Sequence, residues 1–149
     1  MPAEEKGYKV IDRDKAASTE ERMEMMRQAL LCDTYLIGTS ALTEDGQLFN
    51  IDRNGNRVAA MTFGPKQVIV VAGMNKVVQT EATALHRAKT VAAPANVQRF
   101  SNVKTPCNET GACVNCLSAD CFCAFIVQTR ICSPKGRIKV ILVGKDLGL

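Results

Sequence analysis

A run of mostly β-branched residues at positions 67–72, Gln-Val-Ile-Val-Val-Ala, constrains the fold more than any other segment of this chain. The run is continuous rather than alternating, which is typical of a parallel strand covered on both faces. Helical patterns alternate with this strand and with other strand-like segments along the chain. This alternation predicts an α/β fold built on a mixed, mostly parallel sheet.

Local signals place the expected elements along the chain. Ser18 and Glu21 form a capping-box pattern at the start of one helix, and Pro94 is expected to end another. Helices are therefore expected at residues 18–32, 57–63 and 80–93. Strands are expected at residues 33–40, 47–51, 67–72, 124–131 and 137–143. Turns are expected at residues 44–46 and 54–55, and a hairpin turn at residues 133–136 should join the last two strands.

Size and composition limit the classes of protein that this chain can represent. Its 149 residues are enough for one domain, residues 1–149, with a buried core. The net charge is +4, but the basic residues are scattered and Trp is absent, so a nucleic-acid partner is not expected. The longest strongly apolar run, residues 68–72, is too short to cross a membrane. The first residues contain no apolar signal segment, so a cytoplasmic location is expected.

Five of the seven cysteines lie in one cysteine-rich loop, residues 105–124. They are Cys107, Cys113, Cys116, Cys121 and Cys123, with the spacing C-x5-C-x2-C-x4-C-x-C. In a cytoplasmic chain, thiols at this density indicate a metal ion or an iron–sulfur cluster more than a disulfide framework. Cys113 and Cys116 have the spacing of a metal-binding knuckle, and Cys107 with either Cys121 or Cys123 completes four ligands. Spacing leaves zinc, iron–sulfur and a metal-free loop open.

A dense polar region at residues 38–57 follows the first expected strand. Ligands of open α/β sheets bind beyond the carboxyl ends of strands, and helix N-termini attract anions. The region is therefore a candidate pocket for a small anionic ligand. The residues expected to line it are Thr39, Ser40, Glu44, Asn54, Asn56 and Arg57, with Lys76 reaching it from the end of the next strand. The alternative is that Asp45-Gly46 and Asn54-Gly55 serve only as turns.

Several segments, taken in order, match a known family. SALTEDGQLFNIDRNGNRVAAMTFGPKQVIVVAGMNKVV is followed by AAPANVQRF, TPCNETGACVNC and the terminal GRIKVILVGKDLGL. Together they resemble the lactate-utilization (LUD) domain family, and more narrowly its subgroup with a four-cysteine insertion. The resemblance runs from Tyr8 to Leu149. The first segment is also similar to methylthioribose-phosphate isomerases and to related initiation-factor subunits.

The resemblance implies both a fold and a function. The fold is a three-layer α/β sandwich like that of CoA transferases and ribose-phosphate isomerases. The function is a redox-accessory role in the oxidation of lactate or a related hydroxy acid, alongside iron–sulfur partner subunits. The fourth cysteine of the subgroup aligns with Cys123. The resemblance therefore implies Cys107, Cys113, Cys116 and Cys123 as metal ligands, with Cys121 as an extra thiol.

Two other functions stand as alternatives. One is an enzyme of isomerase or transferase type, in which Glu44 or Asp45 acts as acid and base, Arg57 and Lys76 hold an anionic substrate, and zinc braces the loop. The other is a zinc-stabilised interaction module without catalysis. The resemblance also implies that an N-terminal α/β portion of the relatives is missing from this chain. A missing neighbouring strand would leave an open sheet edge, so we expect a homo-oligomer.

Overall fold

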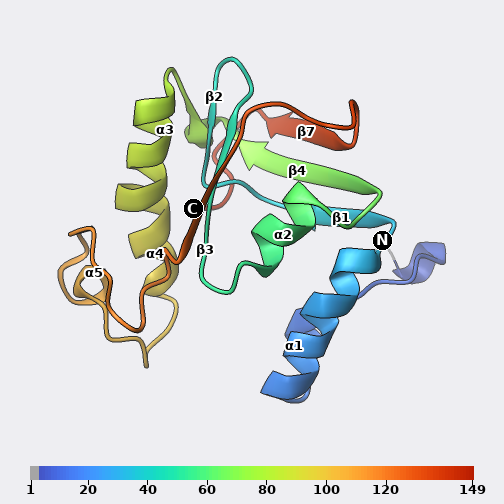
Figure 1. The fold of residues 1–149 in the computed structure, drawn as a ribbon, viewed down its shortest axis with the longest axis horizontal. Helices are drawn as coiled ribbons and strands as arrows, with labels where there is room; N and C mark the ends of the chain where they lie inside the picture. The colour runs from blue at the N-terminus through green and yellow to red at the C-terminus, as the bar shows by residue number, and fades with distance from the viewer. Residues whose placement is uncertain (1–3) are drawn as a thin grey trace.

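The protein, a computed structural model that describes residues 4–149, has an α/β fold with two sheets (Figure 1). The first sheet is parallel, in the order β1 (Thr34–Ile37), β4 (Gln67–Gly73), β7 (Ile138–Val143). The second is mixed, in the order β5 (Val77–Val78), β2 (Ala41–Thr43), β3 (Leu48–Asp52), β6 (Phe125–Thr129). The α/β class predicted from the sequence is confirmed, whereas the single sheet is replaced by two.

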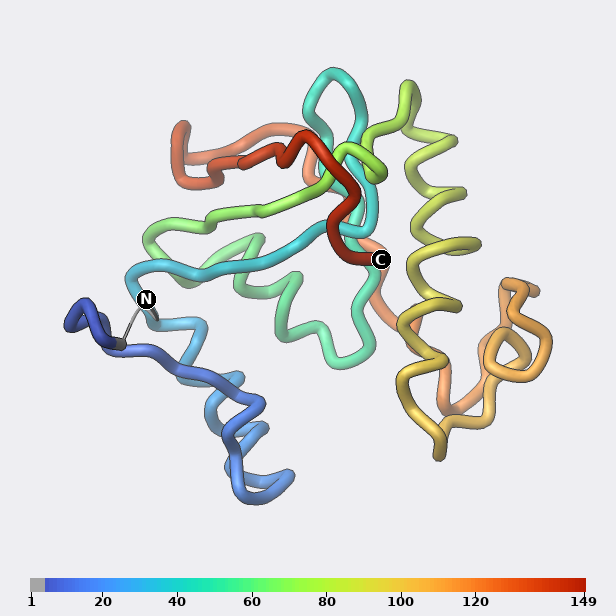
Figure 2. Tube along the Cα trace, turned by 180° about the vertical axis from the view of Figure 1, so that it is seen from behind, coloured from blue at the N-terminus to red at the C-terminus, as the bar shows by residue number. Residues whose placement is uncertain are grey.

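Helices cover these sheets on different sides. The α-helices are α1 (Thr19–Gln28), α2 (Asn56–Thr62), α3 (Glu81–Arg87), α4 (Ala93–Val97) and α5 (Pro106–Thr110). Short 3₁₀ turns lie at Glu4–Lys6, Arg13–Lys15, Ala29–Leu31 and Met74–Lys76, and a π-helical turn lies at Ala88–Ala92. Figures 1 and 2 show α3, the π turn and α4 as one column beside the mixed sheet, with α1 and α2 on the other side of the molecule.

The main apolar core lies between the two sheets and α2. Its buried members are Ile37, Leu42, Leu48, Met61, Val68, Val70 and Ala72. Along β4, Val68, Val70 and Ala72 are fully buried, whereas Ile69 and Val71 are only partly buried. The expectation that this strand is covered on both faces is therefore wrong. One face of the parallel sheet meets the core, and the other has no complete apolar cover.

The strand expected at residues 33–40 is shorter than predicted, and a second strand that the sequence did not predict follows it in the other sheet. β1 pairs with β4 and ends at Ile37, whereas β2 begins at Ala41 and pairs with β3 and β5. Residues 38–40 carry the chain from one sheet to the other. The turn at Gly46, which has a φ of 93°, and the left-handed Gly55 before α2 are where the sequence predicted turns.

The hairpin predicted for the last two strands does not form. β6 pairs antiparallel with β3, whereas β7 pairs in parallel with β4, so the two strands belong to different sheets. Residues 133–136 are therefore part of a crossover between sheets. The apolar runs of β6 and β7 indicate that both are strands. The runs do not indicate which strand each one pairs with, because that depends on the sheet edge that each strand reaches in the fold.

Helix starts follow the sequence signals closely. The Oγ of Ser18 accepts a hydrogen bond from the N–H of Glu21 (3.1 Å), and the Glu21 carboxylate accepts one from the N–H of Ala17 (2.6 Å). The helix expected to end at Pro94 continues instead to Val97. The π-helical turn before α4 changes the hydrogen-bond pattern just where proline removes an N–H donor.

Candidate functional site

The space between the carboxyl ends of β1 and β4, here called the crevice, is filled by the buried side chain of Lys76. Lys76 ends the 3₁₀ turn that follows β4, and its side chain points back under the end of β1. The Nζ donates a hydrogen bond to the carbonyl oxygen of Thr39 (3.0 Å), and the residue is only 6% exposed. Because adjacent parallel strands end at the same edge, the sheet itself brings these segments together.

Arg87, on α3, is the second cation of this crevice. Its Nε donates to the carbonyl oxygen of Asn75 (3.0 Å), and its Nη1 donates to the carbonyl oxygen of Ser40. The guanidinium therefore ties the segment after β1 to the segment after β4. Sequence reasoning missed Arg87, although one signal was present. It lies on the helix face that buries Ala84 and Ala88, where a charged residue is unusual.

The electrostatics of the crevice favour an anion. Burial lowers the pKa of Lys76, and the positive charge of Arg87 lowers it further. Burial also lowers the pKa of the Arg87 guanidinium. Among residues 4–149, neither cation forms an ion pair with a carboxylate. The buried Lys76 and the partly buried Arg87 have no counter-charge, so a bound negative group would stabilise both.

The segment of residues 145–149 lies across this crevice. The amide side chain of Asn75 holds it twice, accepting from the N–H of Leu147 (3.2 Å) and donating to the carbonyl oxygen of Gly148 (3.3 Å). The N–H of Met74 donates to the carbonyl oxygen of Lys145 (3.3 Å). A Cβ at Gly73 would lie 2.3 Å from the nitrogen of Leu147, so only glycine allows this approach. The segment thus forms part of the crevice wall.

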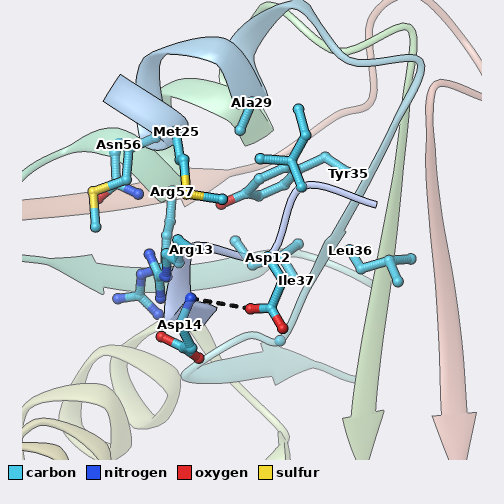
Figure 3. Close-up of a pocket in the computed structure, with 13 residues that line it drawn as sticks. Asp12, Arg13, Asp14, Met25, Ala29, Tyr35, Leu36, Ile37, Asn56 and Arg57 are labelled. Atoms are coloured by element: carbon cyan, nitrogen blue, oxygen red, sulfur yellow. Dashed lines mark hydrogen bonds between the residues drawn. The ribbon is translucent and has the colours of Figure 1, made fainter. Parts of the chain in front are cut away.

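A cavity of about 310 Å³ opens next to the crevice, between β1, α1 and the start of α2. Figure 3 shows the guanidinium groups of Arg13 and Arg57 on the same side of it. Burial raises the pKa of Tyr35, while Arg13 and Arg57 act in the opposite direction. Gly38 also lines the cavity, and a Cβ at Gly38 would lie 3.9 Å from the Nζ of Lys76. Gly38 therefore borders both spaces.

Asp52 holds Arg57 in position at the start of α2. The Asp52 carboxylate accepts from the backbone N–H of Arg57 (2.9 Å) and pairs with its Nε (3.1 Å). The Nη2 of Arg57 donates to the carbonyl oxygen of Ile51 (2.8 Å). Two of the three guanidinium nitrogens are thereby occupied, so Arg57 is held rigidly against the cavity. Asn56 lines the same cavity.

The remaining residues of the predicted pocket are not gathered at one point. The Thr39 hydroxyl lies within hydrogen-bond distance of the carbonyl oxygens of Ala41 and Phe49. The Ser40 Oγ accepts from the N–H of Ile51 (3.4 Å). Both side chains therefore stabilise the segment that leads from the parallel sheet to the mixed sheet. Asn54 is exposed in the turn before α2. Glu44 and Asp45 are exposed in the β2–β3 turn, where Thr43 and Gln47 hold Asp45 and lower its pKa. Their catalytic role stays a prediction.

The cysteine loop lies beside α4, at the end of the helical column in Figure 1. The Sγ atoms of Cys116 and Cys121 lie 3.9 Å apart. Backbone N–H groups donate to two sulfurs, from Asn115 to Cys113 (3.4 Å) and from Cys123 to Cys121 (3.4 Å). Soft sulfur donors in this number suit zinc or iron.

Burial and the neighbouring cysteines both affect the pKa of Cys123. Burial raises the pKa of Cys123 to about 12, and the neighbouring Cys121, Cys113 and Cys107 raise it in the same direction. A bound cation would oppose this rise in pKa. As they stand, however, no three Cys, His, Asp or Glu side chains among residues 4–149 form a group that could hold a metal ion. The loop therefore has the donors for a metal, and the sulfurs would need to close around it.

The chain matches a known protein family over most of its length. The family model of the LUD domain matches residues 2–143. This chain belongs to the LUD domain family. The match spans both sheets and the cysteine loop, so the family resemblance seen in the sequence is confirmed for nearly the whole chain.

Searches of the curated proteins and of the solved structures gave no significant match. In the part of this LUD domain that the structure describes, no helix has the length and apolar character needed to span a membrane.

Proposed function

We propose that this LUD domain is a redox-accessory component of lactate or related hydroxy-acid utilization and binds a small carboxylate in the crevice around Lys76. One observation carries the proposal. Lys76 is almost fully buried beside Arg87, and no carboxylate in the described part of the chain neutralises either cation. A buried cation without a counter-charge is costly even when it is hydrogen-bonded, and such groups are found where a ligand supplies the missing charge.

The chemistry of the crevice suits a monocarboxylate of few atoms. Lys76 has three N–H donors, of which the carbonyl oxygen of Thr39 takes one. The segment at residues 145–149 leaves little room beside the Nζ, because a Cβ added at Gly148 would lie only 3.0 Å from it. A hydroxy acid or an oxo acid presents one carboxylate and one adjacent oxygen, both of which accept hydrogen bonds. The neighbouring cavity, with Arg13 and Arg57, extends the basic character of this edge.

The cysteine loop is the proposed redox element. The resemblance assigns Cys107, Cys113, Cys116 and Cys123 as ligands of a zinc ion or an iron–sulfur cluster. An iron–sulfur cluster would supply one-electron transfer to partner iron–sulfur subunits, whereas zinc would only stabilise the loop. Lys89 donates a hydrogen bond to Asn115 and thereby holds the cysteine loop against the helical column.

Binding of lactate and pyruvate to Lys76→Met and to the unaltered chain tests the crevice. Losing one charge-assisted hydrogen bond should weaken binding about tenfold or more. Lys66→Gln is the matched control, because it removes the same charge from an exposed surface pair with Asp33. Titration calorimetry should show binding to the unaltered chain and to the control, and weakened binding to Lys76→Met. Absence of binding to the unaltered chain, or equal binding to Lys76→Met, would overturn the proposal.

The finer family placement belongs to the same proposal. We infer membership of the four-cysteine subgroup, the three-layer arrangement of the CoA-transferase and ribose-phosphate-isomerase superfamily, and a location in the cytoplasm. The spacing of the five cysteines supports the subgroup, and the change of sheets at residues 38–40 is compatible with the superfamily. Seven free thiols support a reducing compartment.

A further inference from the structure

The cavity beside β1 contains guanidinium groups whose hydrogen-bond donors are partly or wholly free. It has a volume of about 310 Å³ and lies at β1, which is an end strand of the parallel sheet. The Arg13 side chain lines it and, in the part of the chain that the structure describes, forms no ion pair. Arg57 presents its Nη1, because Asp52 and Ile51 occupy its other two nitrogens.

Tyr35 adds a third donor to the same part of the cavity. Figure 3 shows the guanidinium groups of Arg13 and Arg57 on one side of the cavity. Burial raises the pKa of Tyr35, and the positive charges of both arginines lower it, so both lie near its hydroxyl. No hydrogen bond to another described residue contributes to that pKa. Two guanidinium groups and one hydroxyl therefore surround one region of the cavity.

The carboxylates that line the cavity are already engaged. The Asp12 carboxylate accepts a hydrogen bond from the backbone N–H of Asp14 (3.0 Å). Figure 3 shows this carboxylate on the opposite side from the guanidinium groups of Arg13 and Arg57. Asp14 itself forms an ion pair with Arg22 of α1 (2.8 Å). The free polar groups are therefore mainly donors, which an anion that only accepts hydrogen bonds complements.

A phosphate group matches these donors better than a carboxylate does. It offers three strong acceptor oxygens, one for each donor group, whereas a carboxylate offers two. The cavity is also larger than inorganic phosphate requires, because a volume of about 300 Å³ already holds a small organic ligand. Much of the remaining lining is apolar and comes from Met25, Met26, Ala29 and Ile37. An apolar organic group would pack against these side chains.

We propose that this cavity binds a phosphate monoester with a small apolar organic group. Arg13, Arg57 and Tyr35 contact the phosphate, and the methionines of α1 contact the organic group. Asp52 acts as a positioning residue, since it holds Arg57 in place. The site lies beside the Lys76 crevice and does not depend on the carboxylate proposed to bind there.

Titration calorimetry with three probes tests the class of ligand. Phenyl phosphate has both parts of the proposed ligand, inorganic phosphate lacks the ring, and benzoate carries a carboxylate in place of the phosphate. Phenyl phosphate should bind the unaltered chain most tightly, and each of the other two should bind at least about tenfold more weakly. Absence of phenyl phosphate binding, or equal binding of either other probe, would overturn the inference and leave the lactate and pyruvate test untouched.

Two variants test the residues. Arg13→Gln should weaken the binding of phenyl phosphate about tenfold or more, and Tyr35→Phe, which keeps the ring, should weaken it about threefold or more. Arg99→Gln is the matched control, because Arg99 is exposed beyond α4 and outside the cavity lining. Equal effects of Arg13→Gln and Arg99→Gln would overturn the inference. Binding lost in Lys76→Met but kept in Arg13→Gln would also overturn it, because the phosphate would then occupy the crevice.

Discussion

At the scale of single residues, the crevice depends on two cations that the sequence treats very differently. Lys76 follows a strong strand signal, so its position at the end of a strand was predictable. Arg87 is far along the chain on a helix and reaches the same place only through the packing of α3 on β2. The predicted Glu44 and Asp45 belong to a turn in which Gln47 donates hydrogen bonds to Thr43 and Asp45. The sequence therefore predicted the turn, but it did not predict that Lys76 and Arg87 would lie close together.

The lowered pKa of Lys76 predicts a pH dependence of both binding and stability. Between that lowered pKa and the ordinary value of 10.5, the folded state holds fewer protons at this site than the unfolded state. Stability at this site therefore rises with pH through that window, while affinity for a carboxylate falls as Lys76 loses its charge. Urea denaturation of the unaltered chain and Lys76→Met should differ by this rise, and calorimetry should show the loss of affinity. Equal pH profiles for the two chains would contradict it.

At the scale of elements, the capping residues and the turns at residues 44–46 and 54–55 were predicted correctly, whereas the hairpin at residues 133–136 and the strand partners were not. Ser18, Thr80 and Gly55 begin helices as their types predict, because caps depend on neighbours within a few residues. β6 and β7 were expected to pair with each other, yet each joins a separate sheet. Strand pairing depends on distant segments, so a local pattern does not specify it.

The segment at residues 145–149 offers a test at this scale. In Gly73→Ala, the added Cβ would meet the backbone nitrogen of Leu147 at 2.3 Å and the carbonyl oxygen of Lys145 at 2.6 Å. The segment should therefore leave the crevice, and the amides of Met74 and Leu147 should exchange with deuterium faster. Gly144→Ala is the control, because a Cβ there meets nothing within 4 Å. Unchanged exchange in Gly73→Ala would show that the segment adapts in place.

At the scale of the whole molecule, the parallel sheet has one face without an apolar cover. On that face, Leu36 is 70% exposed and Ile141 is 50% exposed, and they flank Ile69 and Val71 in register. Apolar side chains gathered on a sheet are typical of surfaces that another element or chain covers. The homo-oligomer was expected from an open sheet edge and stays a prediction, and we expect this face to contribute to it.

Light scattering tests that prediction directly. The unaltered chain should have the mass of a dimer or a larger oligomer. Leu36→Glu should shift it toward the monomer, because a charge on this face opposes burial. Leu31→Glu is the control, since Leu31 is 89% exposed and lies outside the sheet. A monomer at all concentrations for the unaltered chain would contradict the prediction.

The sequence by itself determined the α/β class, the helix starts, the turns at residues 44–46 and 54–55, the family and the cysteine loop, because each depends on local pattern or on a long ordered series of motifs. Only the tertiary structure decided that the strands form two sheets, that Arg87 joins Lys76, and that the partly buried Cys123 packs against the cluster of Ile51, Ala88 and Ala93. The physical reason is the same in each case. Such contacts join segments through packing, and their free energy depends on geometry that residue type and spacing do not contain.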